Sequence, residues 1–233
     1  MNIAADGRKG LIIAIDGPSG AGKSSVTHAL AERLGYVHID TGAMFRVVAL
    51  MVQRHGADAA DETAIAALCK GLVIEFDKAG STNRVFANGE DVSSFIRSPE
   101  ISLLTSQVAA LPPVRQALLA MQRELGRQGG VVLEGRDIGT VVFPDADLKF
   151  FLTATPEERG RRRYEELRAK GVPVDLEQTV AEVMQRDQQD MMREHAPLRK
   201  AADAVEIDST GLTPDMVLSL MIAEVRVREA EGR

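Results

Sequence analysis

Several residue types on which whole classes of protein depend are scarce in this chain. Its 233 residues include one cysteine and no tryptophan, and aromatic residues make up 4%. The single Cys69 excludes an intramolecular disulfide and a cysteine-rich zinc site, and we expect it to be a small core residue. No apolar run reaches the ~18 residues that a membrane-spanning helix needs, and residues 1–10 are polar, unlike a signal peptide.

An excess of basic charge is also absent. The net charge of −6 argues against nonspecific binding to nucleic acid or to acidic membranes. Hydrophobic residues make up 45%, which is enough for a core and excludes a disordered or fibrous chain. The four histidines show no metal-ligand spacing, so we expect them to be structural or surface residues. These observations predict a cytoplasmic protein of one large domain, or of one domain with an insertion. We expect a monomer, although the sequence does not determine the oligomeric state.

The strongest signal is a glycine-rich loop between a strand and a helix. Residues 11–15 (Leu-Ile-Ile-Ala-Ile) predict a buried strand, and residues 17–24 (Gly-Pro-Ser-Gly-Ala-Gly-Lys-Ser) are a complete P-loop. From Lys23 onward, apolar residues recur at helical spacing. Backbone N–H groups of such a loop converge on phosphate oxygens, and the helix N-terminus adds positive potential. Lys23 supplies a charge for the β- and γ-phosphates, and the Ser24 hydroxyl can ligate Mg²⁺.

Strands and helices alternate along most of the chain. Further strands are predicted at residues 36–39, 131–133, 148–152 and 204–207, and helices at 41–55, 58–70, 113–127, 155–170, 175–193 and from 213. This alternation predicts an α/β fold with a doubly wound five-stranded parallel sheet and the P-loop at a switch point.

One segment interrupts this alternation. Residues 72–76, 84–87 and 90–92 resemble short antiparallel strands, joined by turns at 78–83 and at Asn88-Gly89. We predict an inserted α+β subdomain at 68–107, with the core formed by residues 1–67 and 108–233.

Arginines follow the predicted strands, as anion recognition requires. Arg46 lies in the segment 40–46, and Arg136 lies in the segment 134–140. Each segment follows a predicted strand, so both are expected at the sheet edge that carries the P-loop. Arginines also cluster at 159–163, and Arg186, Asp190 and Arg193 share one helical face. Taken singly, each group is also compatible with a solvated helix face or ordinary ion pairing. Two arginine-bearing loops beside a P-loop favour a second, phosphate-bearing substrate, and the chain lacks the Asn-Lys-x-Asp motif that GTPases use to bind guanine.

Motifs along nearly the whole chain resemble those of the bacterial cytidylate kinases, within the nucleoside monophosphate kinase group of P-loop kinases. The matching stretches are residues 15–24, 40–46, 88–93, 106–110 with 114–115, 135–146, 158–163, 186–187 and 196–198. The Gly-Arg-Asp run at 135–137, continued through Phe-Pro-Asp-Ala at 143–146, and the insert are specific to this family among such kinases. The resemblance implies phosphorylation of CMP and dCMP by ATP with Mg²⁺, an insert that binds the nucleoside monophosphate, and a helical lid at about 155–172.

The resemblance also implies a role for individual residues. ATP would be bound by Gly17, Ser19, Gly20, Ala21, Gly22, Lys23, Ser24 and Ser25. CMP would be bound by Thr41, Phe45, Arg46, Ser106, Arg115, Arg136, Asp137, Arg186, Asp190 and Arg193. Within that set Ser106, Arg115 and Asp137 would face the cytosine, whose N4 amino group suits a carboxylate. Lys23, Arg162 and Arg163 would act in catalysis, the two arginines by contacting the transition state.

Four positions, at three places in the chain, depart from the family pattern. Phe45 stands where many relatives have tyrosine, Thr41 where serine is common, and Gln189 and Met191 where some relatives have arginine. These departures bear on ribose and base contacts rather than on activity. A kinase for another acceptor, such as UMP or shikimate, and a P-loop protein that only binds nucleotide or hydrolyses it slowly are the alternatives.

Overall fold

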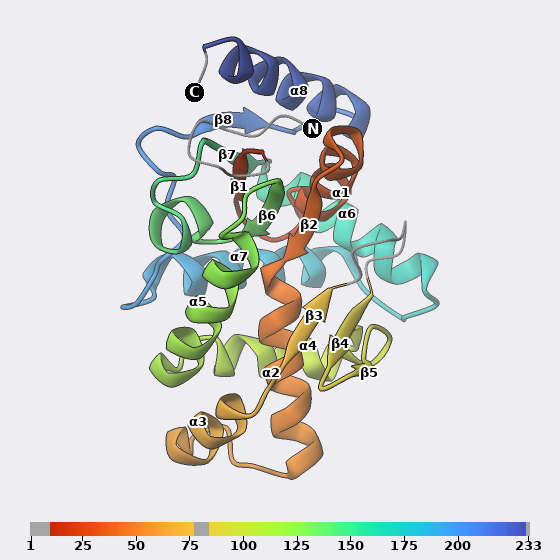
Figure 1. The fold of residues 1–233 in the computed structure, drawn as a ribbon. Helices are drawn as coiled ribbons and strands as arrows, with labels where there is room; N and C mark the ends of the chain where they lie inside the picture. The colour runs from red at the N-terminus through yellow and green to blue at the C-terminus, as the bar shows by residue number, and fades with distance from the viewer. Residues whose placement is uncertain (1–9, 77–83, 232–233) are drawn as a thin grey trace. The chain divides into compact units, whose positions relative to one another are not determined.

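The computed structural model describes residues 10–76 and 84–231. Its contacts divide the chain into two compact units, one of residues 1–38 with 128–233 and the other of residues 39–127. Each unit is described by itself below, with the element labels of Figure 1.

A five-stranded sheet forms the centre of the first unit. Its strand order is β2-β6-β1-β7-β8, with β1 paired in parallel to both β6 and β7, and β7 in parallel to β8. The strands are β2 (Val37–Asp40), β6 (Val131–Gly135), β1 (Ile12–Asp16), β7 (Leu148–Thr153) and β8 (Val205–Asp208). Every residue of β1 is buried, which explains its unbroken apolar run. The predicted doubly wound parallel sheet is confirmed, and the loop after β1 leaves from the middle of the sheet.

Four long helices belong to the same unit. They are α1 (Lys23–Leu34), α6 (Pro156–Ala169), α7 (Leu176–Met192) and α8 (Pro214–Ala230), and α8 packs beside α1 (Figure 1). The predicted starts of the last three are confirmed, because Thr155, Asp175 and Thr213 each accept a hydrogen bond from the backbone N–H three residues on. Leu30, Phe150 and Met221 lie in the core between helices and sheet.

The turn after β6 takes a form that the sequence analysis did not predict. Residues Ile138–Val142 form one turn of π-helix, η2, directly after Arg136 and Asp137. Short π-helical turns are rare and occur often at functional sites.

The second unit combines helices with a small antiparallel sheet. Its elements are α2 (Thr41–His55), α3 (Glu62–Lys70), β3 (Ile74–Phe76), β4 (Val85–Ala87), β5 (Glu90–Asp91), η1 (Phe95–Arg97), α4 (Pro99–Val108) and α5 (Pro112–Gly126). The hairpin predicted at Asn88-Gly89 is confirmed, with positive φ angles of 51° and 82°. The turn predicted at 78–83 lies outside the described residues.

A single hydrophobic core explains the extent of this unit. Val48 of α2 and Leu118 of α5 share a cluster with Ile74 and Ile96, so the predicted insert at 68–107 packs with flanking helices. The unit therefore extends from 39 to 127. No helix is predicted from the sequence at 99–108, where the structure has α4. The helix predicted at 58–70 begins at Glu62, with Asp61 as the cap that accepts from Ala64 N.

None of the helices in the described ranges is both long and apolar enough to cross a membrane.

Candidate active site

The P-loop has a backbone that only glycine accommodates at two places. At Gly17, with φ of 150°, an added Cβ would lie 1.9 Å from the carbonyl oxygen of Leu152. At Gly20, with φ of 77°, it would lie 2.9 Å from the carbonyl oxygen of Arg159. The loop is therefore pressed against the end of β7 and the start of α6, and any side chain at these positions would displace it.

Lys23 lies inside this loop. Its side chain is 6% exposed, and Nζ donates hydrogen bonds of 2.7 Å to the carbonyl oxygens of Gly17 and Pro18. Burial, together with the nearby Arg136 guanidinium, lowers the pKa of Lys23 well below its ordinary value, although Glu134 acts in the opposite direction. The loop thus holds a cation that is poorly solvated, which a bound phosphate would stabilise strongly.

A carboxylate lies beside the first residues of α1. Ser24 Oγ donates to Glu134 Oε2 at 2.8 Å, and His38 Nε2 lies 2.9 Å from Glu134 Oε1. Glu134 ends the apolar run of β6 and is 4% exposed. Burial alone would raise its pKa, but the His38 ring and the Lys23 ammonium hold the pKa of Glu134 below its ordinary value. A charged carboxylate and a hydroxyl are the hard oxygen donors that Mg²⁺ prefers.

Arg159 braces the loop from the start of α6. It is 4% exposed, and it donates to the carbonyl oxygens of Ala154 at 2.9 Å and Ser19 at 3.1 Å. Its Nη1 also lies 2.5 Å from Asp187 Oδ2 on α7. One buried guanidinium therefore joins the P-loop to both helices of the α6–α7 pair.

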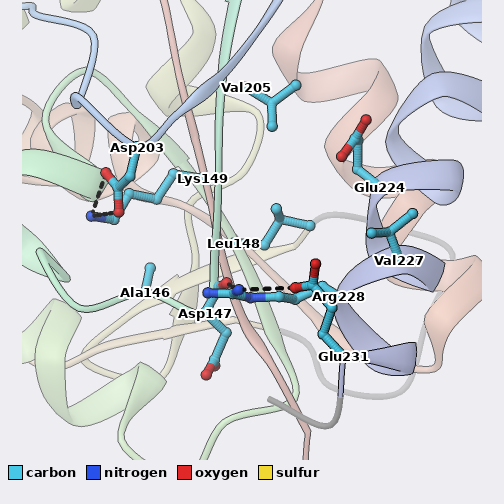
Figure 2. A pocket seen from close by; sticks show the side chains of 10 residues that line it. All are labelled: Ala146, Asp147, Leu148, Lys149, Asp203, Val205, Glu224, Val227, Arg228 and Glu231. Carbon is cyan, nitrogen blue, oxygen red and sulfur yellow. Dashed lines mark hydrogen bonds and ion pairs between the residues drawn. The ribbon is translucent and has the colours of Figure 1, made fainter.

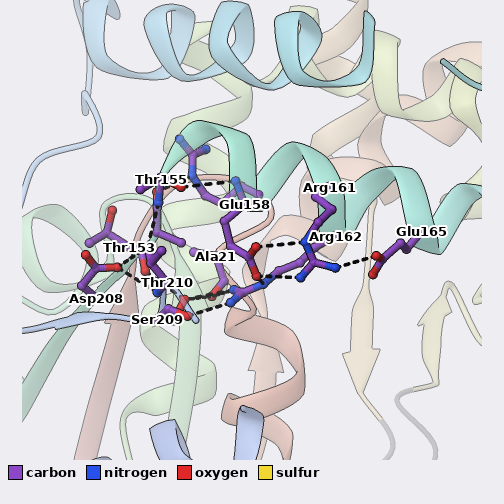
Figure 3. A network of polar contacts seen from close by, with 12 residues as sticks. Ala21, Thr153, Thr155, Glu158, Arg161, Arg162, Glu165, Asp208, Ser209 and Thr210 are labelled. Atoms are coloured by element: carbon purple, nitrogen blue, oxygen red, sulfur yellow. Dashed lines mark hydrogen bonds and ion pairs between the residues drawn. The ribbon is translucent and has the colours of Figure 1, made fainter. Parts of the chain in front are cut away.

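Two further arginines of α6, Arg161 and Arg162, take different directions (Figure 3). Arg162 crosses to the P-loop region, donating to Ser209 Oγ at 3.0 Å and to the Ser209 carbonyl oxygen at 2.7 Å, with Nη1 3.4 Å from the Ala21 carbonyl oxygen. Arg161 instead bonds Glu158 and Glu165 on its own helix face. Arg163 pairs with Glu166, at 2.8 Å. In this arrangement Arg162 is the member of the 161–163 run that contacts the P-loop.

A second group of arginines surrounds Asp190 on α7. Arg136 Nε donates to Asp190 Oδ2 at 2.8 Å, and Arg193 also pairs with this carboxylate. Asp190 is 1% exposed, and although burial opposes it, the guanidiniums of Arg136, Arg193 and Arg186 lower its pKa. The predicted residues Arg136, Arg186, Asp190 and Arg193 are thus brought together, and Arg136 also lies close enough to influence Lys23.

The second unit brings together others of the predicted residues. Arg115 of α5 lies with its guanidinium carbon 5.5 Å from the centre of the Phe45 ring on α2, and it donates to the Ala109 carbonyl oxygen at 3.1 Å. Arg46 Nη1 is 3.9 Å from Asp40 Oδ2, beside the start of α2. Thr41 begins that helix and is buried, and Ser106 lies half-buried on α4, which packs against α2.

The first unit also has a pocket of about 260 Å³ at the starts of β7 and β8, against the last turns of α8 (Figure 2). Both of its basic side chains already have partners, since Lys149 Nζ lies 2.8 Å from Asp203 Oδ2 and Arg228 Nε donates to the Asp147 carbonyl oxygen at 2.7 Å. The P-loop follows the opposite ends of the parallel strands, so this pocket holds none of the predicted site residues.

Several residues that complete the site are not predicted as site residues from the sequence. Asp16 directly follows the apolar run 11–15 and Glu134 the apolar run 131–133, a signal that was available in the sequence. Arg159 was seen only as one of a cluster, and the contacts of His38 and Ser209 have no local signature, because their partners lie far away in the chain.

The fold and the site together define a P-loop kinase. The central strand of a parallel sheet is followed by a complete P-loop, which holds a buried lysine and has arginines around it. Residues 13–227 match the model of the family described as cytidylate kinase, and the chain belongs to this family.

Among curated proteins, the chain is 64% identical to a cytidylate kinase from Citrifermentans bemidjiense, over 96% of each chain. It is 60% identical to a cytidylate kinase from Geobacter sulfurreducens, over 97% of each chain. Among solved structures, an uncharacterized protein from Eubacterium ventriosum matches with a TM-score of 0.52 at 13% identity, covering 93% of this chain and 98% of the other, which supports the fold alone.

Proposed function

We propose that this chain transfers the γ-phosphoryl group of ATP to CMP and dCMP, producing ADP with CDP or dCDP. The observation that carries the proposal is membership of the cytidylate kinase family over residues 13–227, in a chain whose P-loop keeps its buried lysine. The attacking group is a phosphate oxygen that is already anionic near neutral pH, so the chain has to position and neutralise charge rather than supply a strong base.

On the donor side, Gly17 and residues 19–25 bind the phosphates of ATP. The positive φ angles at Gly17, Gly20 and Gly22 support this assignment, because successive backbone N–H groups in such a glycine-rich turn can form an anion-binding concavity. Lys23 then exchanges its two carbonyl partners for phosphate oxygens.

A divalent cation, Mg²⁺, accompanies ATP in this proposal. Ser24 would hold it, with Glu134 beside it, and the oxygen chemistry of this pair fits such an ion. Among residues 10–76 and 84–231 no group of three or more His, Cys, Asp or Glu is placed so that it could hold a metal ion. The ion would neutralise charge on the transferring phosphoryl group. Glu134 keeps the Ser24 hydroxyl oriented, and His38 keeps Glu134 charged.

On the acceptor side, Arg136 and Arg193, with Arg46, bind the phosphate of CMP. The first two support this role because they already share one buried carboxylate, Asp190. That carboxylate holds the two guanidiniums beside one another, and guanidinium N–H groups are well suited to binding a phosphate. Arg186 and Asp190 then lie near the ribose.

Ser106, Arg115 and Asp137 read the cytosine base in this proposal. The Phe45 ring next to Arg115 supplies an apolar face for the base, and Thr41 supports the start of the same helix. Asp137 accepts from the N4 amino group of cytosine, whereas uracil would place the acceptor O4 against the carboxylate.

Arg162 and Arg163 neutralise charge on the equatorial phosphoryl oxygens, as members of a lid helix that excludes water. The contact of Arg162 with the P-loop carbonyl at Ala21 supports its role. Arg163 would have to leave Glu166 to reach substrate.

The base preference gives a direct prediction. Replacing Asp137 by asparagine is expected to lower the ratio of kcat/KM for CMP to that for UMP by about 10- to 100-fold, because the amide can donate to O4 of uracil. Both rates are measured by ADP release, with Asp145→Asn, at an exposed aspartate after η2, as the matched control. A ratio that stays at the wild-type value in Asp137→Asn contradicts the assignment of the base-reading carboxylate.

The test of the whole proposal is ADP release from MgATP with CMP, dCMP, UMP, AMP or GMP added singly. Strong stimulation by CMP and dCMP, and weak stimulation by UMP, is the expected result. Equal rates with CMP and UMP would favour the alternative of a broader nucleoside monophosphate kinase. ADP release that no acceptor stimulates would favour a P-loop protein that only binds or slowly hydrolyses ATP.

A further inference from the structure

Asp16 makes an unusual pair of contacts at the end of β1. Its side chain is 4% exposed, with Oδ1 accepting from Ile138 N at 2.8 Å and Oδ2 from Gly139 N at 2.7 Å. Each carboxylate oxygen therefore binds one of two successive backbone N–H groups. Asp16 immediately precedes the P-loop, and the two N–H groups begin η2, directly after Arg136 and Asp137.

The packing around this contact leaves little freedom. A Cβ at Gly139 would lie 3.0 Å from Lys149 Cδ and 3.4 Å from Asp16 Oδ2, so the backbone of the turn is pressed toward the carboxylate. Lys149 is itself held, since its Nζ bonds Pro144 O and Asp203. Ile138 is fully buried. The turn is thereby fixed from two sides.

From this geometry we propose that Asp16 is a positioning residue, which ties the origin of the P-loop to the turn that carries Arg136 and Asp137. It would hold the acceptor-binding side chains at a set distance from the phosphate-binding loop, without touching either substrate. The role rests on the proposed function, because it assigns the purpose of the contact to CMP binding. Displacement of catalytic groups by as little as 1 Å costs roughly 100-fold in rate.

Charge at Asp16 affects the same contact. Burial raises the pKa of Asp16 to about 6, although the two N–H donors oppose the rise. The ionisable groups facing it are Asp137, which adds to the rise, Lys23, which opposes it, and the stem of Lys149. Above this pKa both oxygens accept hydrogen bonds. As the pH falls through 6, protonation of one oxygen removes an acceptor and weakens the hold on the turn.

The raised pKa also has a consequence for folding. Between the ordinary value of 3.8 and about 6 the native chain holds a proton that the unfolded chain has lost. Asp16 therefore adds to the free energy of unfolding at pH values below its pKa in the unfolded chain. This contribution is lost as the pH rises through 6. At neutral pH a neutral substitute at position 16 does not forfeit stability from this source, so an effect on catalysis can be separated from unfolding.

The experiment compares Asp16→Asn with Asp147→Asn. Asp147 is the matched control because its Oδ2 accepts from Ile12 N at 2.7 Å, at the opposite end of the same strand. In Asp16→Asn we expect the KM for CMP to rise about 10- to 100-fold while the KM for ATP changes less than about threefold. The preference for CMP over UMP should fall as well. In Asp147→Asn these constants should stay within about twofold of wild type.

The pH profile supplies a readout that general loss of structure would not produce. CMP itself ionises near pH 6, so the informative quantity is the difference between variant and wild type in the pH dependence of KM for CMP. This dependence should be weaker in Asp16→Asn, which has no carboxyl at position 16, and unchanged in Asp147→Asn. A profile in Asp16→Asn identical to wild type, with an unchanged KM for CMP, overturns the inference.

A second variant approaches the contact from the other side, should Asp16→Asn fail to fold. Gly139→Ala places a Cβ against Lys149 and Asp16 and should raise the KM for CMP in the same direction. Combined with Asp16→Asn it should add little, because both changes break one contact. If wild type releases no ADP in response to CMP, the proposed function has failed. If wild type responds and both variants match Asp147→Asn, only the role of Asp16 is wrong.

Discussion

Replacing Lys23 by methionine is expected to lower kcat by roughly 1,000-fold or more, the range found when a group that neutralises transition-state charge is removed. The ammonium lies inside the P-loop, 6% exposed, and its partners are the carbonyl oxygens of Gly17 and Pro18. Charge that develops on the transferring phosphoryl group would lose this counter-charge, while methionine retains most of the volume. The rate is measured by ADP release with saturating CMP and MgATP.

The same substitution should leave the fold intact. Burial lowers the pKa of Lys23, which means that keeping it charged costs folding free energy at neutral pH. Removing the charge relieves that cost, so circular dichroism and the Tm of Lys23→Met should stay close to wild type. Lys170→Met is the matched control, since Lys170 is an exposed lysine that pairs with Glu166 on α6. A folded Lys23→Met protein with turnover within tenfold of wild type would contradict the role of this lysine.

Local signatures explain which parts of the fold could be predicted from the sequence. The P-loop combines an apolar strand, closely spaced glycines and a helix start within some twenty residues. Helix caps such as Thr155 and Thr213 are equally local, and both are confirmed. The helix at 99–108 had the same kind of start, since Ser98 accepts from Ile101 N ahead of Pro99, and this available signal was missed.

The extent of the second unit could not be predicted in the same way. Its core joins Val48, Ile74, Ile96 and Leu118, which are separated by long stretches of chain and share no periodicity. The short strands indicated an insert, but the helices packed around them carry an ordinary amphipathic pattern. Such a pattern shows that a helix buries one face and leaves open which partner covers it.

Prediction of the site from the sequence meets the same limit. Arginines near Asp190 could be predicted, because Arg186, Asp190 and Arg193 share a helix face, yet the bond from Arg136 to that aspartate joins residues 54 apart. The acids Asp16 and Glu134 each directly follow an apolar run that the sequence predicts as a strand. Their partners, two backbone N–H groups and a serine hydroxyl, are set by the parallel pairing of β1 and β6.

Glu134 leads to the second prediction with a large effect. Its carboxylate accepts from Ser24 at 2.8 Å and lies 2.9 Å from His38 Nε2, with Lys23 close enough to lower its pKa. Changing Glu134 to glutamine keeps the size and one acceptor but removes the negative charge beside the proposed cation ligand Ser24. Loss of a residue that orients a metal ligand costs about 10- to 100-fold in metal affinity, so the Mg²⁺ concentration for half-maximal rate should rise by that factor.

Two measurements separate this role from general damage. In the first, the rate of Glu134→Gln is titrated with Mg²⁺ at saturating ATP and CMP, where high Mg²⁺ should restore part of the lost activity. In the second, equilibrium binding of a fluorescent ATP analogue is compared with and without Mg²⁺. Wild type should bind the analogue more tightly with Mg²⁺ than without it, and Glu134→Gln should lose most of that difference. Without Mg²⁺, Glu134→Gln should bind the analogue as well as wild type or better, because a negative charge near the phosphates has been removed. Glu206→Gln, on the exposed partner of Lys200, is the control. An unchanged Mg²⁺ titration in a folded Glu134→Gln protein would leave this carboxylate with the structural task of holding Ser24 and His38 alone.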